Sequence, residues 1–307
     1  MSGVKKKLRL AGSVLSIACL AWIAWRFYSE GVLEQLSANG AFYRERWSVA
    51  RAMATYSLAV GVLAFAWATL QRVFVSHARM GPTVSTYLVT QAYKYVPGGI
   101  LQYVGRHVAL RKQGLTHASL ALCAFAEVAC LTAVASAASA SFAARFGILL
   151  PPVAIYASIL SFVCLAVITL GVMRLRVNWV RQRLPTFHAG WLVMALGLYV
   201  VFFLLMGLTL LAVAPSEQAT RTPFATWTAV AAASWMAGFV VIGAPAGLGV
   251  REAVFVTLLS GMASQPAILL TAMCFRLATF GGDVTAYVAG MLWAAFTRRD
   301  GGAAADP

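Results

Sequence analysis

The sequence predicts an all-α polytopic integral membrane protein, with about six full transmembrane helices and two re-entrant hairpins of broken helix. The first observation is composition. Of 307 residues, 61% are hydrophobic and 11% are charged, whereas a soluble domain carries about 25% charged residues. The second is a set of long charge-free runs, and the third is a pair of Pro-Gly breaks inside apolar regions. Together they predict a chain for which lipid is the main solvent.

The long apolar runs mark the spanning helices. A helix needs roughly 20 residues to cross a hydrocarbon core of ~30 Å, and the runs Ala52 to Leu70 and Ala189 to Pro215 hold no charge. Large residues at Trp22 and Trp25 favour an uncleaved first helix over a signal peptide, which needs small residues at its cleavage site. The predicted spans lie near residues 10–28, 50–72, 115–140, 152–173, 190–214 and 266–296.

Residues 83–113 and 224–262 do not fit single crossings. The Pro-Gly-Gly sequence at 97–99 divides the first region into two segments that each reach only about 20 Å as helix. Pro245 divides the second region in the same way. Irregular backbone persists at membrane depth only where protein or water surrounds it. Both breaks therefore predict re-entrant hairpins beside a cavity.

Basic residues set the orientation. The net charge of +15 is concentrated in short links between apolar runs, so a positive-inside bias explains it better than a nucleic-acid partner, which we do not expect. With the N-terminus in the cytoplasm, most of the 24 Lys and Arg residues fall on the inner side. Six spans return the C-terminus to the cytoplasm, in agreement with Arg298 and Arg299.

We expect one membrane domain over residues 1–300. The order span–hairpin–span occurs twice with opposite topology, and inverted repeats with broken helices are typical of transporters. The predicted parts are a first helix with an outer loop (1–48), repeat one (49–145), a linking helix with a basic cytoplasmic loop (146–188), repeat two (189–297) and a disordered cytoplasmic tail (298–307).

The first break is a candidate anion site. Pro97 ends one half-helix, and Gly98 and Gly99 let the chain turn. The next half-helix begins with unpaired N–H groups, which favour an anion. Gln102 and Arg106 share a face of that helix, so they are candidate ligands of a phosphate head group. The alternative is a structural hinge with Arg106 extended toward the cytoplasm.

The second break has a similar pattern. Pro245 is followed by Gly247 and Gly249, and then by Arg251 and Glu252. Glu252 lies in the first turn of the outgoing half-helix, where a carboxylate suits the helix dipole. Two adjacent charges facing lipid are costly, which predicts a polar cavity. The alternative is a local pair between the two charges at the outer interface.

Three further charges lie within predicted spans: Glu127, Arg276 and Asp283. Intramembrane ionisable residues are functional candidates by default. One alternative is a Glu127–Arg276 bridge that locks the two repeats together, and another is a proton relay through either carboxylate. The Gly281-Gly282 pair is a candidate break in the last helix.

Tyr93, Lys94 and Tyr95 precede the first break. Such a group of aromatic and basic residues fits an entrance for lipid head groups, and it fits an ordinary aromatic belt at the membrane interface equally well.

The five cysteines form no CxxC pair and the four histidines show no ligand spacing, so we predict no metal and no cofactor. No GxSxG, HExxH or Walker-type motif occurs, and an enzyme is the less favoured class.

These motifs resemble the lysylphosphatidylglycerol synthase transmembrane (flippase-like) family, also called UPF0104. The resemblance covers roughly residues 50–296. Its first signature, a Pro-Gly break followed by a polar residue and Arg, is matched by Tyr95, Pro97, Gly98, Gln102 and Arg106. Its late signature, Pro-x-Gly-x-Gly-x-x-Glu, is matched by Pro245, Gly247, Gly249 and Glu252. An Arg early in the final helix is matched by Arg276. The family's Glu-Arg pair followed by Asp is reduced here to Glu127, since Val128 follows it.

The resemblance implies a bacterial or archaeal plasma-membrane protein that moves aminoacylated phospholipids or other lipid-linked molecules between leaflets. Its implied partners are membrane lipids, with a lipid-modifying synthase or a glycosyltransferase nearby. We expect Arg106, Arg251 and Arg276 to hold the phosphate. Two alternatives remain: a membrane-embedded transferase acting on a polyprenyl or phospholipid carrier, and a scaffold for a glycosyltransferase.

Overall fold

The computed structural model describes the backbone of residues 41–75, 78–95, 101–146, 188–241, 247 and 249–302. Every regular element within these ranges is a helix, and none is a β-strand. The predicted all-α class is therefore confirmed for the described part of the chain.

Four helices in this part are long and apolar enough to cross a membrane. They are α3 (Ala41–Phe74), α6 (His117–Phe146), α9 (Ala189–Val213) and α13 (Gln265–Gly302). They correspond to the predicted spans near 50–72, 115–140, 190–214 and 266–296. The other two predicted spans, near 10–28 and 152–173, lie outside the described residues.

Three of these helices, α3, α6 and α13, extend well past their predicted ends. The first begins at Ala41, inside the expected outer loop, and α13 continues to Gly302, inside the expected tail. Hydropathy marks where lipid begins, whereas the backbone hydrogen bonds of a helix can continue into water. The break expected at Gly281 and Gly282 is wrong, because α13 passes through both glycines as helix. A glycine costs a helix only about 1 kcal/mol, against about 3 for proline.

The two regions predicted as broken hairpins each contain two short helices. The first region has α4 (Met80–Gln91), the 3₁₀ helix η1 (Ala92–Tyr95) and then α5 (Leu101–Arg111). The second has α11 (Phe224–Val240) and α12 (Val250–Leu259), and α10 (Ser216–Arg221) links α9 to α11. With 12, 11 and 10 residues, α4, α5 and α12 are each about 18 Å long or less. None of these three could cross a membrane alone.

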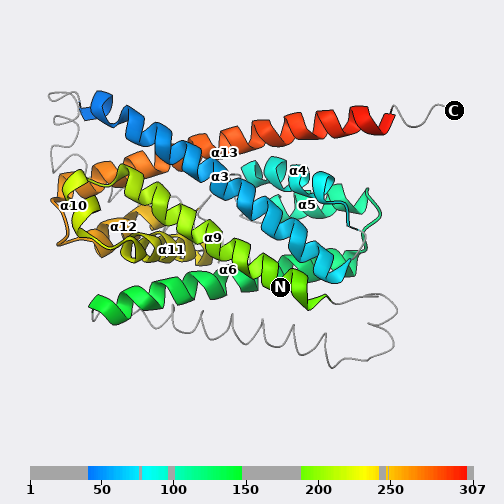
Figure 1. Cartoon of the computed structure of the whole chain (residues 1–307), viewed down its shortest axis with the longest axis horizontal. Coiled ribbons are helices and arrows are strands. Elements are labelled where there is room, and N and C mark those ends of the chain that lie inside the picture. Colours follow the sequence, from blue (N-terminus) through cyan, green and yellow to red (C-terminus); the bar gives the residue numbers. More distant parts are fainter. Residues whose placement is uncertain are drawn as a thin grey trace, which may run out of the picture.

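The long helices alternate in direction. Figure 1 shows α3 and α13 running one way along the bundle, with α6 and α9 running the other way. The end of α3 lies beside the start of α9, where the His188 N–H donates to the Val73 carbonyl at 3.3 Å. The α4–α5 pair lies toward this end, and the α11–α12 pair lies toward the opposite end (Figure 1).

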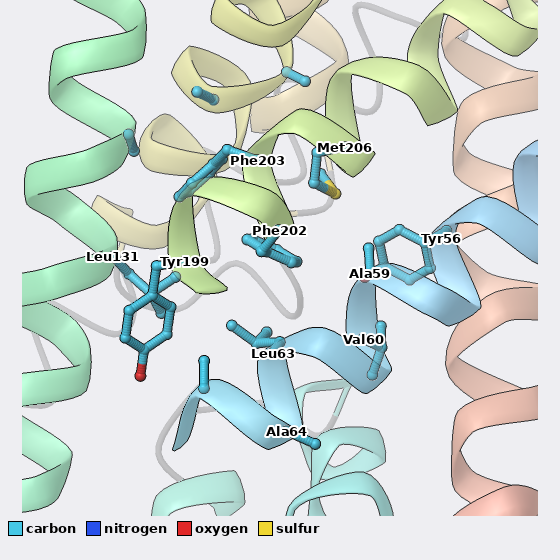
Figure 2. Packing of buried hydrophobic residues seen from close by; sticks show 14 of the residues in the cluster. Tyr56, Ala59, Val60, Leu63, Ala64, Leu131, Tyr199, Phe202, Phe203 and Met206 are labelled. Carbon is cyan, nitrogen blue, oxygen red and sulfur yellow. The ribbon is translucent and has the colours of Figure 1, made fainter. Parts of the chain in front are cut away.

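The core of the bundle is the contact between α3 and α9. Figure 2 shows small residues of α3, such as Ala59, facing large residues of α9, such as Phe202 and Met206. All three are buried. Small residues let helices approach closely in lipid, where dispersion contacts drive association. This close packing positions the polar side chains of the neighbouring helices.

Candidate functional site

The described charges at membrane depth form two separate clusters. The Arg106 cluster contains Tyr87, Thr90, Gln91, Arg106 and Glu127. The Asp283 cluster contains Tyr56, Lys94, Tyr95, Arg251, Glu252, Arg276 and Asp283. The two differ in charge balance and in how completely their polar atoms are paired.

In the Arg106 cluster, each nitrogen of the guanidinium group has an acceptor. Nη1 donates to both carboxylate oxygens of Glu127, at 2.9 and 2.8 Å. Nη2 donates to Gln91 Oε1 at 2.9 Å, and Nε donates to Thr90 Oγ1 at 3.3 Å. The Arg106 side chain is 3% exposed. A charge-assisted bidentate pair of this kind is strong, and here it is electrically neutral.

Aromatic rings enclose this pair. The Tyr87 ring centroid lies 3.6 Å from Arg106 Cζ, and its hydroxyl group donates to Glu127 Oε1 at 2.8 Å. Trp67 and Tyr103 approach Cζ to 5.3 Å each. The guanidinium is therefore held by α4 and α6 and does not extend to the cytoplasm. The snorkelling alternative is wrong, because Glu127 and these rings replace the water that an exposed arginine would seek.

Two further details concern the surroundings of α5. The amide that contacts Arg106 is Gln91 of α4, not Gln102 of its own helix. The space beside Gly105 is taken by Tyr93, since a Cβ there would lie 2.8 Å from Tyr93 Cε2. This glycine lets α5 pack against an aromatic ring and leaves no room for a substrate.

The centre of the second cluster is the Asp283 carboxylate of α13. Lys94 Nζ lies 2.8 Å from Oδ1 and 2.7 Å from Oδ2. The Tyr95 hydroxyl group donates to Oδ2 at 2.5 Å, and the Tyr56 hydroxyl group donates to Oδ1 at 3.4 Å. The carboxylate is 2% exposed. It joins η1 of the first broken region to α3 and to the last long helix.

Glu252 is the second carboxylate of this cluster. Its Oε2 accepts from the Gly249 N–H at 2.8 Å and so caps α12, as a carboxylate in the first turn should. Gly249 has a φ of 82°, which favours glycine. The other carboxylate oxygen lies 3.6 Å from Arg276 Nε. The alternatives of a Glu127–Arg276 bridge and of an Arg251–Glu252 pair are therefore both wrong, since each carboxylate has a closer cation from a different helix.

Arg251 is held in a slot between two glycines. A Cβ on Gly238 would lie 2.6 Å from its Cγ and Nε, and a Cβ on Gly247 would lie 2.8 Å from Nε. The Nε atom is buried and has no hydrogen-bond partner. The ion pairs of the described side chains do not include Arg251. This arginine thus brings a positive charge that no described carboxylate pairs.

The members of the Asp283 cluster are close enough to act as one electrostatic unit. Arg251 directly precedes Glu252 on α12, and the Glu252 carboxylate lies 3.6 Å from Arg276 Nε. Arg276 Cζ lies 6.0 Å from the Tyr95 ring centroid, and Lys94 Nζ lies 5.5 Å from it. Three cations and two carboxylates give the described cluster a net charge of +1.

The structure thus divides the predicted site. Pro97, Gly98, Gly99 and Pro245 lie outside the described residues. Arg106 and Glu127 pair with each other in one cluster, whereas Arg276 pairs with Glu252 in the other. Apart from Gln102, the remaining predicted residues lie in or directly beside the Asp283 cluster: Tyr95, Gly247, Gly249, Arg251, Glu252, Arg276 and Asp283.

Sequence reasoning missed Tyr56, Tyr87 and Gln91. Each is a polar residue inside an apolar helix, and this is the feature of the sequence from which it could have been found. Tyrosine is common in membrane helices and is usually assigned to the interface. Tyr56 and Asp283 are 227 residues apart in the sequence, so no local sequence pattern indicates their contact.

A pocket of about 270 Å³ opens beside the Arg106 cluster. Its wall is mainly aromatic and aliphatic: Trp67, Tyr103, Val104, Arg106, His107, Val108, Leu120 and Ala124. Because the Arg106 charge is already balanced by Glu127, this pocket suits hydrocarbon better than an anion. Among the described residues, no three His, Cys, Asp or Glu side chains gather in a way that could hold a metal ion.

The two electrostatic clusters therefore have different chemical capacities. The Arg106 cluster is neutral and its guanidinium is fully paired, whereas the Asp283 cluster has an excess positive charge and a buried donor. Comparison with known proteins adds no family to this description: no model of a protein family matches the chain, and no curated protein matches it.

Proposed function

We propose that this protein is a transporter that moves a phospholipid or a lipid-linked molecule with an anionic head group between the leaflets of a membrane. The observation that carries the proposal is the net charge of +1 in the Asp283 cluster, together with the buried and unpartnered Nε of Arg251. Arg276 and Asp283 belong to a helix of spanning length. A phosphate oxygen would satisfy both the charge and the donor.

The energetic argument concerns the cost of an unbalanced charge. A charged side chain at the centre of a membrane helix costs ~2.5–3.5 kcal/mol on insertion scales. The Arg106–Glu127 pair offsets that cost internally. Arg251 lacks such a partner among the described residues. A cation held in this way is expected where a ligand provides the counter-charge.

The arrangement of the broken helices supports a transporter rather than a static scaffold. Two pairs of short helices lie toward opposite ends of the bundle (Figure 1), as an inverted repeat of span–hairpin–span units requires. In this proposal both breaks are re-entrant and the repeats move against each other. The resemblance to the flippase-like family points the same way, as does placement in a bacterial or archaeal plasma membrane with both termini cytoplasmic.

The rival function is a membrane-embedded transferase, which would need a carboxylate base beside its acceptor. Both candidates are occupied. Glu127 accepts from Arg106 and Tyr87, and Asp283 accepts from Lys94 and two tyrosines. These donors occupy the carboxylate oxygens that a base would have to turn toward its substrate. Transport therefore fits the geometry better.

The test is leaflet translocation of fluorescent anionic phospholipids in proteoliposomes. Arg251→Gln should insert normally and reduce the translocation rate by about tenfold or more, equivalent to ~1.4 kcal/mol of barrier. Arg221→Gln is the matched control, because Arg221 is 78% exposed and pairs only at the surface with Glu217. Equal rates for both variants would contradict the proposal. Turnover of an activated sugar donor without any lipid movement would favour the transferase.

A further inference from the structure

Lys94 is the lysine of the Asp283 cluster, and its side chain is slightly less exposed than that of Arg276, which is 19% exposed. Lys94 lies on η1, the 3₁₀ helix that ends at Tyr95, directly before the first break. Its side chain is 14% exposed, compared with 2% for Asp283. A lysine carries its charge on a flexible four-carbon stem. Its ammonium group can therefore change partner without a change in the backbone.

The other cations of the cluster are more restricted. The stem of Arg251 is confined between Gly238 and Gly247. Arg276 pairs with Glu252, and the Glu252 carboxylate is itself fixed by the Gly249 N–H. These contacts tie both arginines to the second broken region, whereas Lys94 lies on the first.

Asp283 does not depend on Lys94 alone. The hydroxyl groups of Tyr56 and Tyr95 both donate to it, one to each carboxylate oxygen. The carboxylate would thus keep two hydrogen-bond donors if the lysine moved away.

Counting charges then defines the ligand. On the basis of the proposed function, we infer that the Asp283 cluster selects a phosphodiester with a single negative charge, and that Lys94 exchanges Asp283 for that phosphate. Three cations and three anions then balance. A phosphomonoester carries about 1.5 to 2 negative charges at neutral pH and leaves the cluster negative. In a medium of low dielectric constant such an excess is costly. The net charge of the cluster therefore determines which phosphate ester it accepts, and Lys94 provides one of the three positive charges.

The experiment is equilibrium binding to the purified full-length protein in detergent. The probes are dihexanoyl phosphatidylglycerol, a diester, and dihexanoyl phosphatidic acid, a monoester, at about pH 8, where the monoester carries about two charges. The wild type should prefer the diester. Glycerophosphoglycerol, the same head group without chains, should bind much more weakly if the source is a lipid, and equally well if a soluble phosphodiester is the ligand.

Three variants change the charge count. Lys94→Gln makes the described cluster neutral and should weaken diester binding by about tenfold or more. Asp283→Asn raises the count to +2 and should shift the ratio of the two affinities toward the monoester by about tenfold. The double variant restores +1, and the preference for the diester should return. The controls Lys112→Gln and Glu217→Gln alter exposed residues and should change neither affinity.

A purely structural role predicts another pattern. In that case Asp283→Asn weakens both probes equally and the double variant restores no selectivity, which would overturn the inference. Asp283→Asn leaves a partly buried lysine without its carboxylate. If that single variant does not fold, the selectivity of the double variant is compared with that of the wild type instead. Selective binding without translocation would refute the transporter and leave the inference intact. Translocation with equal affinity for both probes would refute the inference alone.

Discussion

At the scale of single residues, Arg106 and Asp283 are the two centres around which the polar side chains are arranged. Arg106 directs its three nitrogens to acceptors on α4 and α6. Asp283 receives donors from α3 and η1. The first centre is closed and neutral, so its role is to hold helices together. The second has an excess positive charge, which is the basis of the proposed ligand binding.

Glu127→Gln should therefore lower stability rather than alter selectivity. It leaves the Arg106 charge buried without its carboxylate, and breaking a buried pair costs about 3–5 kcal/mol. The double variant Arg106→Gln, Glu127→Gln should recover much of that loss, because no charge is left unpaired. Thermal unfolding in detergent measures both effects. Glu217→Gln is the control, since exposed substitutions change stability by about 0.5 kcal/mol or less. A double variant no more stable than Glu127→Gln would contradict this view of the pair.

Sequence alone identified most of the important charges but not their partners. Arg106, Glu127, Arg276 and Asp283 stand out because charges inside apolar helices are costly. Their pairing depends on how helices pack, and the sequence interpretation offered only Arg276 as a partner for Glu127. Packing assigns it to Arg106, 21 residues away, and gives Arg276 to the carboxylate that caps α12.

At the scale of the helices, glycines determine how closely α13 can approach α3. A Cβ on Gly282 would lie 2.5 Å from Tyr56 Cδ1 and 3.2 Å from the Met53 carbonyl oxygen. A Cβ on Gly281 would lie 2.5 Å from Met53 Sδ. The Gly-Gly pair thus acts as a contact surface within a continuous helix. This contact also places Tyr56 within reach of Asp283, one residue further along α13.

Gly282→Ala should separate these two helices. The added methyl group meets backbone on one side, so overpacking should cost about 1–3 kcal/mol. Gly197→Ala on α9 is the matched control, because nothing lies within 4 Å of a Cβ there. That change should be neutral or stabilising by up to about 1 kcal/mol. Unfolding temperatures of the two variants measure the difference. A Gly282→Ala protein as stable as the control would show that the helices are not tightly packed here.

The lengths and positions of these helices could largely be predicted. Long apolar runs placed the four described spanning helices, and proline with glycine placed both interruptions. The helix ends could not be predicted as well. Residues 41–48 and 297–302 are helical although they lie beyond the apolar part of their helices. A helix that has already formed adds further residues at little cost in free energy, even in water.

At the scale of the whole molecule, the alternating directions of the long helices place successive connections at opposite ends of the bundle (Figure 1). The α5–α6 link lies at the end where α3 finishes, and α10 lies at the other end (Figure 1). Contacts between distant segments hold this arrangement, such as the Lys94–Asp283 pair across 189 residues. A pattern of local sequence cannot reveal pairs of this kind, which is why the division into two clusters was not predicted.

The predicted orientation can be tested with single cysteines at the two ends. Lys112→Cys should react with a membrane-impermeant maleimide only in inside-out vesicles, because the basic links are expected in the cytoplasm. Gln218→Cys, on α10, should react only in intact cells. The unsubstituted protein provides the background, since the sequence has five cysteines. Labelling of both positions from one side would exclude the predicted topology.

The slot around Arg251 has a wider consequence. It exists because two positions from separate segments, Gly238 and Gly247, both lack a side chain. A methyl group at Gly238 would meet a flexible arginine stem rather than rigid backbone, so the guanidinium could be displaced while the helices stay assembled. A homologue with alanine at this position could thus keep its fold, its expression level and its thermal stability while the Arg251 charge is displaced. Thermal stability in such a homologue would therefore not show that it keeps the proposed activity.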